Sequence, residues 1–295
     1  MMSNVKVFRL AYVDFSAKNA GAMVDYYTHT MGYRITEEKD GVTYLSNGLD
    51  HHNIVITPAE EKAIRRYGYQ LDGKLTLEEV QEQLHSRGIA SSLKTGAKPG
   101  ISSFIELQDP AGNVLELFTD MEQTAIGFGN SGIVPLKLGH IAFYAKNFKE
   151  TINFYNDVLN FAFTDQIGVD FANFLTCNTD HHVINIVASE ETRLHHIAFQ
   201  LKDASHQYAS SDLLAKHGRP ILWGPSRHTA GHNIATYHHD PEENVVELYT
   251  DMDVFISELG IFEPRPWHEM LPQKPKVWEA LSAWGTEFEL DLANV

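Results

Sequence analysis

Two stretches of this chain are variants of one another: QDPAGNVLELFTDM at residues 108–121 and HDPEENVVELYTDM at residues 239–252. Their Asp-Pro steps lie 131 residues apart (240 minus 109). A second pair, LDHH at residues 49–52 and TDHH at residues 179–182, recurs at an offset of 130 (179 minus 49). Self-similarity at a nearly fixed offset indicates that one structural module occurs twice. Differences between the copies then indicate which copy has kept its chemistry.

Each half of the chain repeats a pattern of one strand, one helix and further strands. Apolar residues alternate where strands are expected and recur at helical spacing where helices are expected, and glycines follow several of the helices. The expected elements are residues 8–13 (strand), 17–31 (helix), 77–86 (helix), 139–145 (strand), 149–160 (helix) and 205–217 (helix). The predicted fold class is α+β, with two tandem domains, each of two βαβββ modules forming a half-barrel around a central site.

The repeat also predicts the domain boundaries. Residues 1–130 form the predicted N-terminal domain, which binds no metal, and residues 136–260 form the predicted C-terminal metal-binding domain. Residues 127–135 are rich in Gly, Asn and Ser, which is typical of a linker. Residues 261–295 lie outside the repeat and contain several prolines and tryptophans. This tail must pack on something, and a structural wrap is favoured over a lid covering the site.

The composition favours a protein that acts on small molecules. The net charge is −16, from 23 basic and 39 acidic residues, and it argues against nucleic acid and anionic membranes as partners. The single cysteine, Cys177, excludes an intramolecular disulfide framework and fits a reducing cytoplasm. Neither a secretory h-region nor a long apolar run is present, so we expect neither export nor a membrane span.

Histidines distinguish the second copy from the first. LGHIAF at residues 138–143 and LHHIAF at residues 194–199 each place a histidine before an apolar alternation. At the matching places the first copy has Arg9 in FRLAY and Arg66 in RRYGY. Arginine does not give up its proton to become a metal ligand. The chemistry is therefore expected in the second copy.

The predicted metal ligands are His140, His196 and Glu247. A single strand histidine is more often a core or surface residue, but these three residues lie at equivalent places in successive modules. Two neutral imidazoles and one carboxylate on one face leave coordination positions open, which suits Fe(II), and Mn(II) would fit the same donors. Glu116 survives in the first copy without histidine partners, so it is expected to be structural, paired with Arg9 or Arg66.

These motifs resemble the two-domain type I extradiol ring-cleaving dioxygenases of the vicinal oxygen chelate superfamily. The resemblance covers nearly the whole chain and is densest from residue 138 to residue 251. CNTDHH at residues 177–182 resembles the stretch that carries the family's acid/base histidine, which implies this role for His182. PSRH at residues 225–228 resembles the stretch with a second histidine and implies His228. Tyr237 follows nine residues later, and Glu247 ten after that, at the family's intervals.

The resemblance implies an oxidoreductase that uses Fe(II), less often Mn(II), to cleave a catechol with dioxygen next to the diol. The product would be of the 2-hydroxymuconic semialdehyde type. His182 would stabilise charge on the bound oxygen and then protonate it, Tyr237 would donate to the oxygen at the attacked carbon, and His228 would bind a substrate oxygen. The resemblance also implies a homo-oligomer.

The chain departs from the family pattern at three places. Glu242 and Glu243 stand where the family usually has Gly or Pro, and His238 stands where an apolar residue is usual. His232 lies close enough in the sequence to compete with His228 as the substrate-side histidine. None of these residues belongs to the predicted metal triad, so the departures concern the substrate pocket and its loops.

Phe171, Phe174 and Trp223 are expected to line the pocket, which favours a catechol with hydrogen, alkyl, halogen or aryl substituents. A carboxylated catechol ranks second, with Arg219 or Arg227 near it. Three rival functions remain open: a metal-dependent isomerase or lyase of the glyoxalase kind, a hydroquinone-cleaving enzyme, and a metal-free aromatic-binding protein. The glyoxalase kind would use extra carboxylate ligands, and a metal-free binder would have no need of the triad.

Overall fold

The computed structural model describes residues 4–268 and 270–287 and divides the chain into two units. The first unit contains the chain up to residue 138 with residues 158–160 and 240–242, and the second contains the remainder. Each unit has a large sheet and few helices, so the predicted fold class of two tandem α+β domains is confirmed. No helix in the described ranges is long and apolar enough to cross a membrane.

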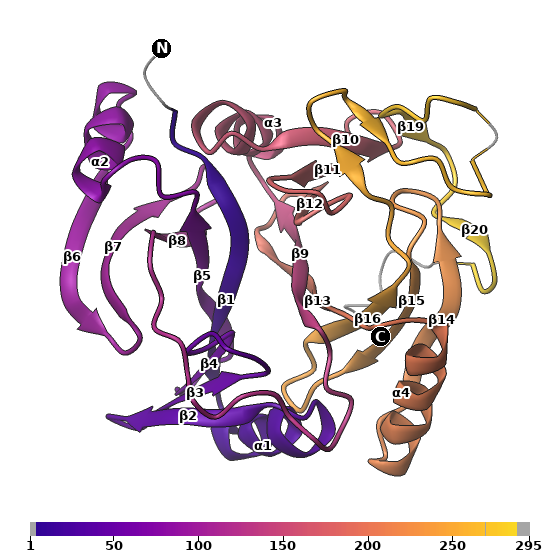
Figure 1. Ribbon diagram of the computed structural model, residues 1–295, viewed down its shortest axis with the longest axis horizontal. Helices are drawn as coiled ribbons and strands as arrows, with labels where there is room; N and C mark the ends of the chain where they lie inside the picture. Colours follow the sequence, from indigo (N-terminus) through magenta and orange to yellow (C-terminus); the bar gives the residue numbers. More distant parts are fainter. Residues whose placement is uncertain (1–3, 269, 288–295) are drawn as a thin grey trace. The chain divides into compact units, whose positions relative to one another are not determined.

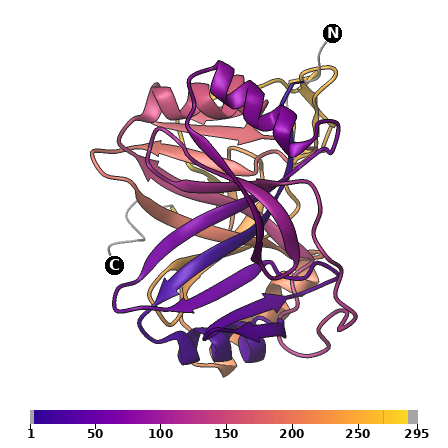
Figure 2. The same ribbon diagram turned by 90° about the vertical axis from the view of Figure 1, so that its left-hand side faces the viewer.

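The first unit is an eight-stranded sheet in the order β2-β3-β4-β1-β5-β8-β7-β6. Its two modules meet where β1 pairs with β5, and the helices α1 and α2 lie at opposite ends of the unit (Figures 1 and 2). Its elements are β1 (Val7–Ala17), α1 (Ala20–Asp25), η1 (Tyr26–Thr30), β2 (Arg34–Lys39), β3 (Val42–Ser46), β4 (Ile54–Pro58), β5 (Ala63–Leu71), α2 (Leu77–Ser86), β6 (Ser91–Lys98), β7 (Ile101–Gln108) and β8 (Val114–Phe118).

The second unit repeats this arrangement around β9 and β13, and α4 packs against β14, β15 and β16 (Figure 1). The repeated elements are β9 (Lys137–Ala145), α3 (Phe148–Asn153), η2 (Phe154–Val158), β10 (Ala162–Ile167), β11 (Ala172–Thr176), β12 (Ile184–Ala188), β13 (Arg193–Gln200), α4 (Ala204–Lys216), β14 (Ile221–His228), β15 (Ile234–His239) and β16 (Val245–Thr250).

The tail belongs to the sheet of the second unit. After the small β17 (Phe255–Ile256) and β18 (Ile261–Phe262) pair, β19 (Val277–Trp278) pairs with the edge strand β10. The next strand, β20 (Ser282–Trp284), pairs with β14 at the opposite edge. The sheet therefore has ten strands in the order β19-β10-β11-β12-β9-β13-β16-β15-β14-β20. The favoured structural wrap agrees with this pairing, since the tail joins both edges of the sheet.

The first helix of each unit differs from its prediction. The strand predicted at residues 8–13 continues to Ala17, and the helix after it changes from α1 to the π-helical turn η1. The helix predicted at residues 149–160 changes in the same way from α3 to η2. In η1 the amide of Met31 donates to the carbonyl of Tyr26, five residues earlier, at 3.0 Å. Periodicity predicted a helix, but it did not show this change of winding.

The predicted linker is held against the first unit. The amides of Ile133 and Val134 donate to the carbonyls of Thr30 and Met31, each at 2.9 Å. Asn47 donates from Nδ2 to the carbonyl of Pro135 at 2.7 Å. Glycine-rich composition correctly indicated a segment without helix or strand, but these backbone hydrogen bonds make it part of the unit before it.

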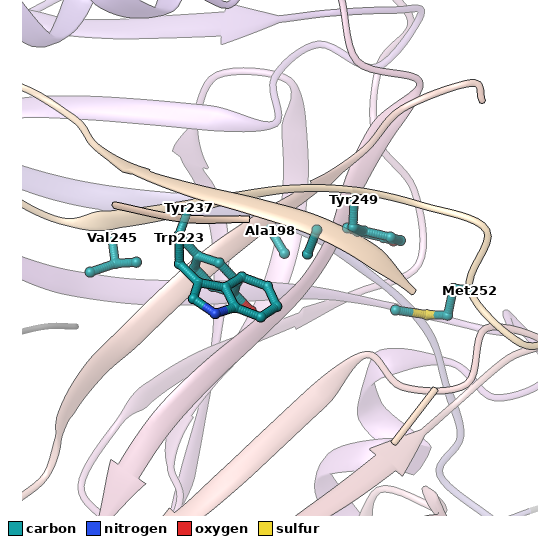
Figure 3. Close-up of a cluster of buried hydrophobic side chains, with 7 residues drawn as sticks. Ala198, Trp223, Tyr237, Val245, Tyr249 and Met252 are labelled. Carbon is teal, nitrogen blue, oxygen red and sulfur yellow. The ribbon is translucent and has the colours of Figure 1, made fainter. Parts of the chain in front are cut away.

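Apolar side chains on one face of β13–β16 build a core next to the candidate site. Figure 3 shows this cluster, in which Trp223 and Tyr237 pack with ring centroids 5.5 Å apart. Because side chains alternate between the faces of a strand, Tyr237 and Tyr249 are buried with this cluster while His238 faces the other side. The cluster consists of Ala198, Trp223, Ala235, Tyr237, Val245, Tyr249 and Met252.

Candidate metal centre

The three predicted ligands converge in the second unit. His140 comes from β9, His196 from β13 and Glu247 from β16, and all three side chains are buried. The Nε2 atoms of the two histidines are 3.2 Å apart. Each of these nitrogens lies 3.1 Å from Oε2 of Glu247. Pairing of β13 with β16 places Glu247 opposite Ala198, two residues after His196. The triad is thus built by neighbouring strands with side chains on one face.

The three donor atoms fit a divalent metal ion. Ligands at about 2.1 Å from one ion and at right angles to one another lie roughly 3 Å apart, as these atoms do. Nδ1 of His196 is 2.7 Å from Nδ1 of His195, and a hydrogen bond donated to His195 leaves the lone pair of Nε2 facing the triad. Asn233 donates from Nδ2 to the other oxygen of Glu247, Oε1, at 2.7 Å. The oxygen that faces the two imidazole nitrogens is Oε2.

The electrostatics also favour the metal-binding protonation states. Burial lowers the pKa of His140, so its imidazole is neutral. Burial alone would raise the pKa of Glu247, but His140 and His196 outweigh it and hold that pKa well below the usual range. A neutral imidazole and an ionised carboxylate are the forms that bind a cation.

The three predicted catalytic residues surround the triad. The ring centroid of His182 is 4.2 Å from that of His140. The hydroxyl of Tyr237 donates to Oε2 of Glu247 at 2.9 Å, and it lies 3.0 Å from Nε2 of His228. Burial lowers the pKa of His182 well below its usual range and lowers that of His228. Burial, followed by the charge of Glu247, raises the pKa of Tyr237 well above its usual value, so the phenol keeps its proton.

All six predicted site residues line one pocket, and this pocket has a polar and an apolar end. The triad, the three catalytic residues, His195 and two asparagines line the polar part. The residues of the apolar part are Ile167, Ala172, Phe174, Val187, Ala230 and Leu281. Among the described residues that line the pocket, none is a lysine or an arginine. The pocket can therefore place a small molecule with an uncharged body against the metal centre.

The two histidines considered for the substrate side differ in position. His228 lines the pocket and stacks on Trp223, with ring centroids 4.8 Å apart and an angle of 13° between the planes. His232 instead donates from Nδ1 to Oδ2 of Asp253 at 2.7 Å and contacts Trp278 of the tail. Sequence spacing alone did not decide between the two histidines, because they are only four residues apart and either side chain could point into the pocket.

The predicted pocket wall needs two changes. Phe174 lines the pocket as expected, but Phe171 packs behind the apolar end and Trp223 lies behind His228. The sequence prediction missed Asn233 and Leu281, which both line the pocket. Asn233 follows the His228 loop and could have been suspected from that position. Leu281 lies in the tail, outside the repeat, where no sequence signal connected it with the site.

Strand pairing corrects one assignment in the first unit. In β1 and β4, Val13 pairs with Ile54, and in β9 and β12, Ile141 pairs with Ile184. The residue equivalent to His140 is therefore Tyr12, rather than Arg9 as predicted. The strands β1 and β9 are offset by 128 residues (140 minus 12). The prediction used the offset of 131 found between the two Asp-Pro steps, and this difference caused the error.

Cations replace the metal in the first unit. Arg66 is the equivalent of His196, as predicted, because Gly68 pairs with Glu116 in the way that Ala198 pairs with Glu247. Nε of Arg66 is 3.2 Å from Oε1 of Glu116, and Nζ of Lys98 contacts Oε2. Arg9 instead pairs with Asp50 at 2.7 Å. Of the two partners expected for Glu116, Arg66 is right and Arg9 is wrong.

Comparisons with known proteins show the family of this chain and its fold. The model of the Glyoxalase/Bleomycin resistance protein/Dioxygenase superfamily matches residues 9–117 and 137–248. Metapyrocatechase 2 of Cupriavidus necator is 27% identical over 122 residues, which are 41% of this chain and 38% of that protein. The 3-methylcatechol 2,3-dioxygenase of Pseudomonas putida is 24% identical over 266 residues, 82% of this chain and 89% of that protein. The Mn(II)-bound glyoxalase of Novosphingobium aromaticivorans shares the fold, with a TM-score of 0.84, 24% identity and coverage of 98% of this chain and 94% of its own.

Proposed function

Because this chain belongs to the Glyoxalase/Bleomycin resistance protein/Dioxygenase superfamily, we propose that it is an extradiol dioxygenase that cleaves a catechol next to its diol. The observation that carries the proposal is the single pocket in which His182, His228 and Tyr237 surround the triad of two histidines and one glutamate. A triad alone would serve several reactions. The added neutral histidines and protonated tyrosine suit proton transfer and oxygen binding.

Fe(II) is the proposed metal, and Mn(II) is the alternative with the same donors. His140, His196 and Glu247 would hold the ion and leave its pocket side open. When bound, the ion supplies a Lewis acid that favours loss of a catechol hydroxyl proton and a place where catechol and dioxygen meet. The donor geometry supports a divalent ion, and the open positions favour a metal that must accept two molecules at once.

The chain's own residues would move protons and hold oxygens. His182 is neutral, so it would accept the proton from a substrate hydroxyl and return it as the ring opens. Tyr237 keeps its proton and would donate a hydrogen bond to the oxygen at the attacked carbon. His228, stacked on Trp223, would bind a substrate oxygen from the opposite side.

The reaction balances without a further reductant. One molecule of dioxygen is reduced, and its O–O bond and one ring C–C bond break. One oxygen atom becomes part of a carboxylate, and the other becomes the new carbonyl oxygen. The proton held by His182 returns to the product, so the protein ends in its starting state.

An uncharged catechol is the proposed substrate class. The apolar end of the pocket suits hydrogen, alkyl, halogen or aryl substituents. Arg227, one of the two expected partners of a carboxylated catechol, donates from Nη2 to Asp251 at 2.9 Å and stacks on Trp267. A carboxylate in the pocket would therefore lose its hydration without gaining a cationic partner.

The proposal is tested by loading the metal-free protein with Fe(II) under anaerobic conditions and then adding catechol and air. We expect oxygen uptake equal to the catechol consumed, together with a yellow ring-opened product. Metal bound at one ion per chain without oxygen uptake on any catechol would reject the proposal. Absence of metal binding would reject the metal centre as well.

An isomerase or lyase of the glyoxalase kind is the second candidate, because a Mn(II)-bound glyoxalase shares the fold. The pocket favours the dioxygenase, since Glu247 is the one carboxylate among its described lining residues. The two candidates separate in one assay: the isomerase would convert a thiol adduct of a 2-oxoaldehyde without consuming oxygen. The homo-oligomer implied by the family resemblance remains a prediction.

A further inference from the structure

A hydrogen-bonded series of three buried side chains ends at His182. Oδ2 of Asp165, on β10, lies 3.0 Å from Nε2 of His181. Nδ1 of His181 lies 3.0 Å from Nδ1 of His182. The side chain of His181 is fully buried and that of Asp165 is 2% exposed. Phe262 stacks on the His181 ring, with centroids 5.0 Å apart, which restricts its rotation.

Two donors from the tail determine which atoms of these three hydrogen-bonded side chains carry hydrogen. The indole Nε1 of Trp278 donates to Oδ2 of Asp165 at 2.7 Å, and the amide of Lys276 donates to Oδ1 at 2.9 Å. Both oxygens of Asp165 therefore act as acceptors, so Nε2 of His181 must be the donor between them. Nδ1 of a neutral His181 is then an acceptor, and Nδ1 of His182 donates to it. These assignments follow from the hydrogen-bond network.

We infer that Asp165 and His181 are positioning residues that hold His182 in the tautomer with hydrogen on Nδ1 and a lone pair on Nε2. This inference rests on the proposed function, in which His182 accepts a proton from the substrate inside the pocket. A neutral imidazole has one lone-pair nitrogen, and the hydrogen bond at the other nitrogen selects which one it is. With the reverse tautomer, His182 would present an N–H group to the pocket and could not accept the proton.

The first unit contains the equivalent hydrogen-bonded series of side chains, but without the metal triad. His51 lies 3.0 Å from His52 through their Nδ1 atoms and 3.2 Å from Glu37 through Nε2. The side chain of Glu37 is 38% exposed, in contrast to the buried Asp165. The module can therefore fold with an acid–His–His series of hydrogen bonds whether or not it performs chemistry. The series in the first unit supplies a control, because a variant there reports any effect on folding that is not an effect on the site.

The decisive variant is His181→Phe, which keeps a ring against Phe262 and removes the acceptor for His182. We expect kcat to fall roughly 10- to 100-fold, the usual effect of removing such a supporting residue, with KM and metal content nearly unchanged. His181→Asn places an amide oxygen near the lost nitrogen and should recover much of the rate. The control variant His51→Phe should retain wild-type kcat.

Proton–nitrogen correlation spectra of the metal-free protein report the His182 tautomer independently of turnover. We expect the Nδ1–H form in the wild type and in His181→Asn, and its loss in His181→Phe. An unchanged tautomer or an unchanged kcat in His181→Phe would overturn the inference, as would an equal loss in His51→Phe. If no catechol is cleaved by the wild type while the tautomer still depends on His181, the proposed function fails and the positioning role stands.

Discussion

The carboxylate of Glu247 divides its two oxygens between different tasks. Oε1 accepts a hydrogen bond from Asn233, and Oε2 meets the two histidine nitrogens and the hydroxyl of Tyr237. The hydrogen bond from Asn233 to Oε1 leaves Oε2 facing His140 and His196, where an ion held by the two histidines would meet it. Asn233 therefore helps to orient the carboxylate with Oε2 toward the two histidines that would hold an ion with it.

Glu247→Gln should abolish metal binding. The amide has no charge to offset that of the cation, and its NH₂ group would face the histidine nitrogens. We expect metal content to fall from one ion per chain to near zero, measured after gel filtration in Fe(II) or Mn(II). The matched variant Glu116→Gln should leave metal content unchanged. It removes the partner of Arg66, which is partly exposed, and of Lys98, whose side chain is buried, so it should lower the free energy of unfolding. Equal metal loss in both variants would contradict the assignment.

His182→Phe should separate binding from chemistry. The ring volume is kept and the proton acceptor is removed, so we expect normal metal content with turnover lower by roughly 100- to 10,000-fold. Metal analysis and oxygen uptake on one preparation provide the measurement. Unchanged turnover would show that the proton acceptor is another residue.

At the scale of elements, alternation and periodicity predicted strands and helices well, and pairing register was the main source of error. Apolar alternation in β9 and β13 reflects burial of each strand, so it can be read from local sequence. The offset between β1 and β9 depends on how many residues separate paired strands, which local patterns do not contain. For that reason Arg9 was matched to His140 in place of Tyr12. The two π-helical turns were missed because buried aromatic residues in them, such as Tyr26 and Phe154, also fit the spacing expected of an α-helix.

Strand β15 carries a titratable group on each face. His238 lies on the opposite face of β15 from Tyr237 and is fully buried. This burial, and then the charge of Arg219, lower the pKa of its imidazole to about 3. The unfolded chain takes up a proton near pH 6.5, whereas the folded chain does so only near pH 3. The contribution of neutral His238 to the free energy of unfolding is therefore fully present above pH 6.5, and it decreases as the pH falls toward 3.

His238→Gln should flatten this part of the pH profile. The wild type should lose up to about 1.4 kcal/mol of unfolding free energy per pH unit from this group alone. Urea unfolding of both proteins between pH 7 and pH 4, at about half-unit steps, measures the difference. Parallel profiles for the two proteins would show that folding does not lower the pKa of His238.

At the scale of the whole chain, the repeat predicted two units and the location of the metal centre, but the tail could not be placed. Its strands join the sheet through backbone hydrogen bonds, such as that from Gln166 to the carbonyl of Lys276 at 3.0 Å. Backbone groups are the same in every residue, so no side-chain pattern announces such pairing. The tail pairs with both edges of the sheet of the second unit and also supplies Leu281 to the pocket.

The charge of the whole chain predicts a preference among substrates. A net charge of −16 repels anions, and the described lining of the pocket has no lysine or arginine to bind them. We expect kcat/KM for a carboxylated catechol to be at least about 100-fold below that for an alkyl catechol. Added salt should raise the value for the carboxylated substrate by screening and leave that for the uncharged substrate unchanged. Equal values for both substrates at low salt would contradict this account.

The central claim is that the second unit inserts both atoms of dioxygen into a catechol. The most direct measurement is mass spectrometry of the product formed by the Fe(II)-loaded protein from an alkyl catechol under isotopically labelled dioxygen. The account predicts a ring-opened product with a label in the carboxylate and a label in the new carbonyl, read before that carbonyl exchanges with water. An unlabelled product, or an oxidised but unopened ring, would contradict it.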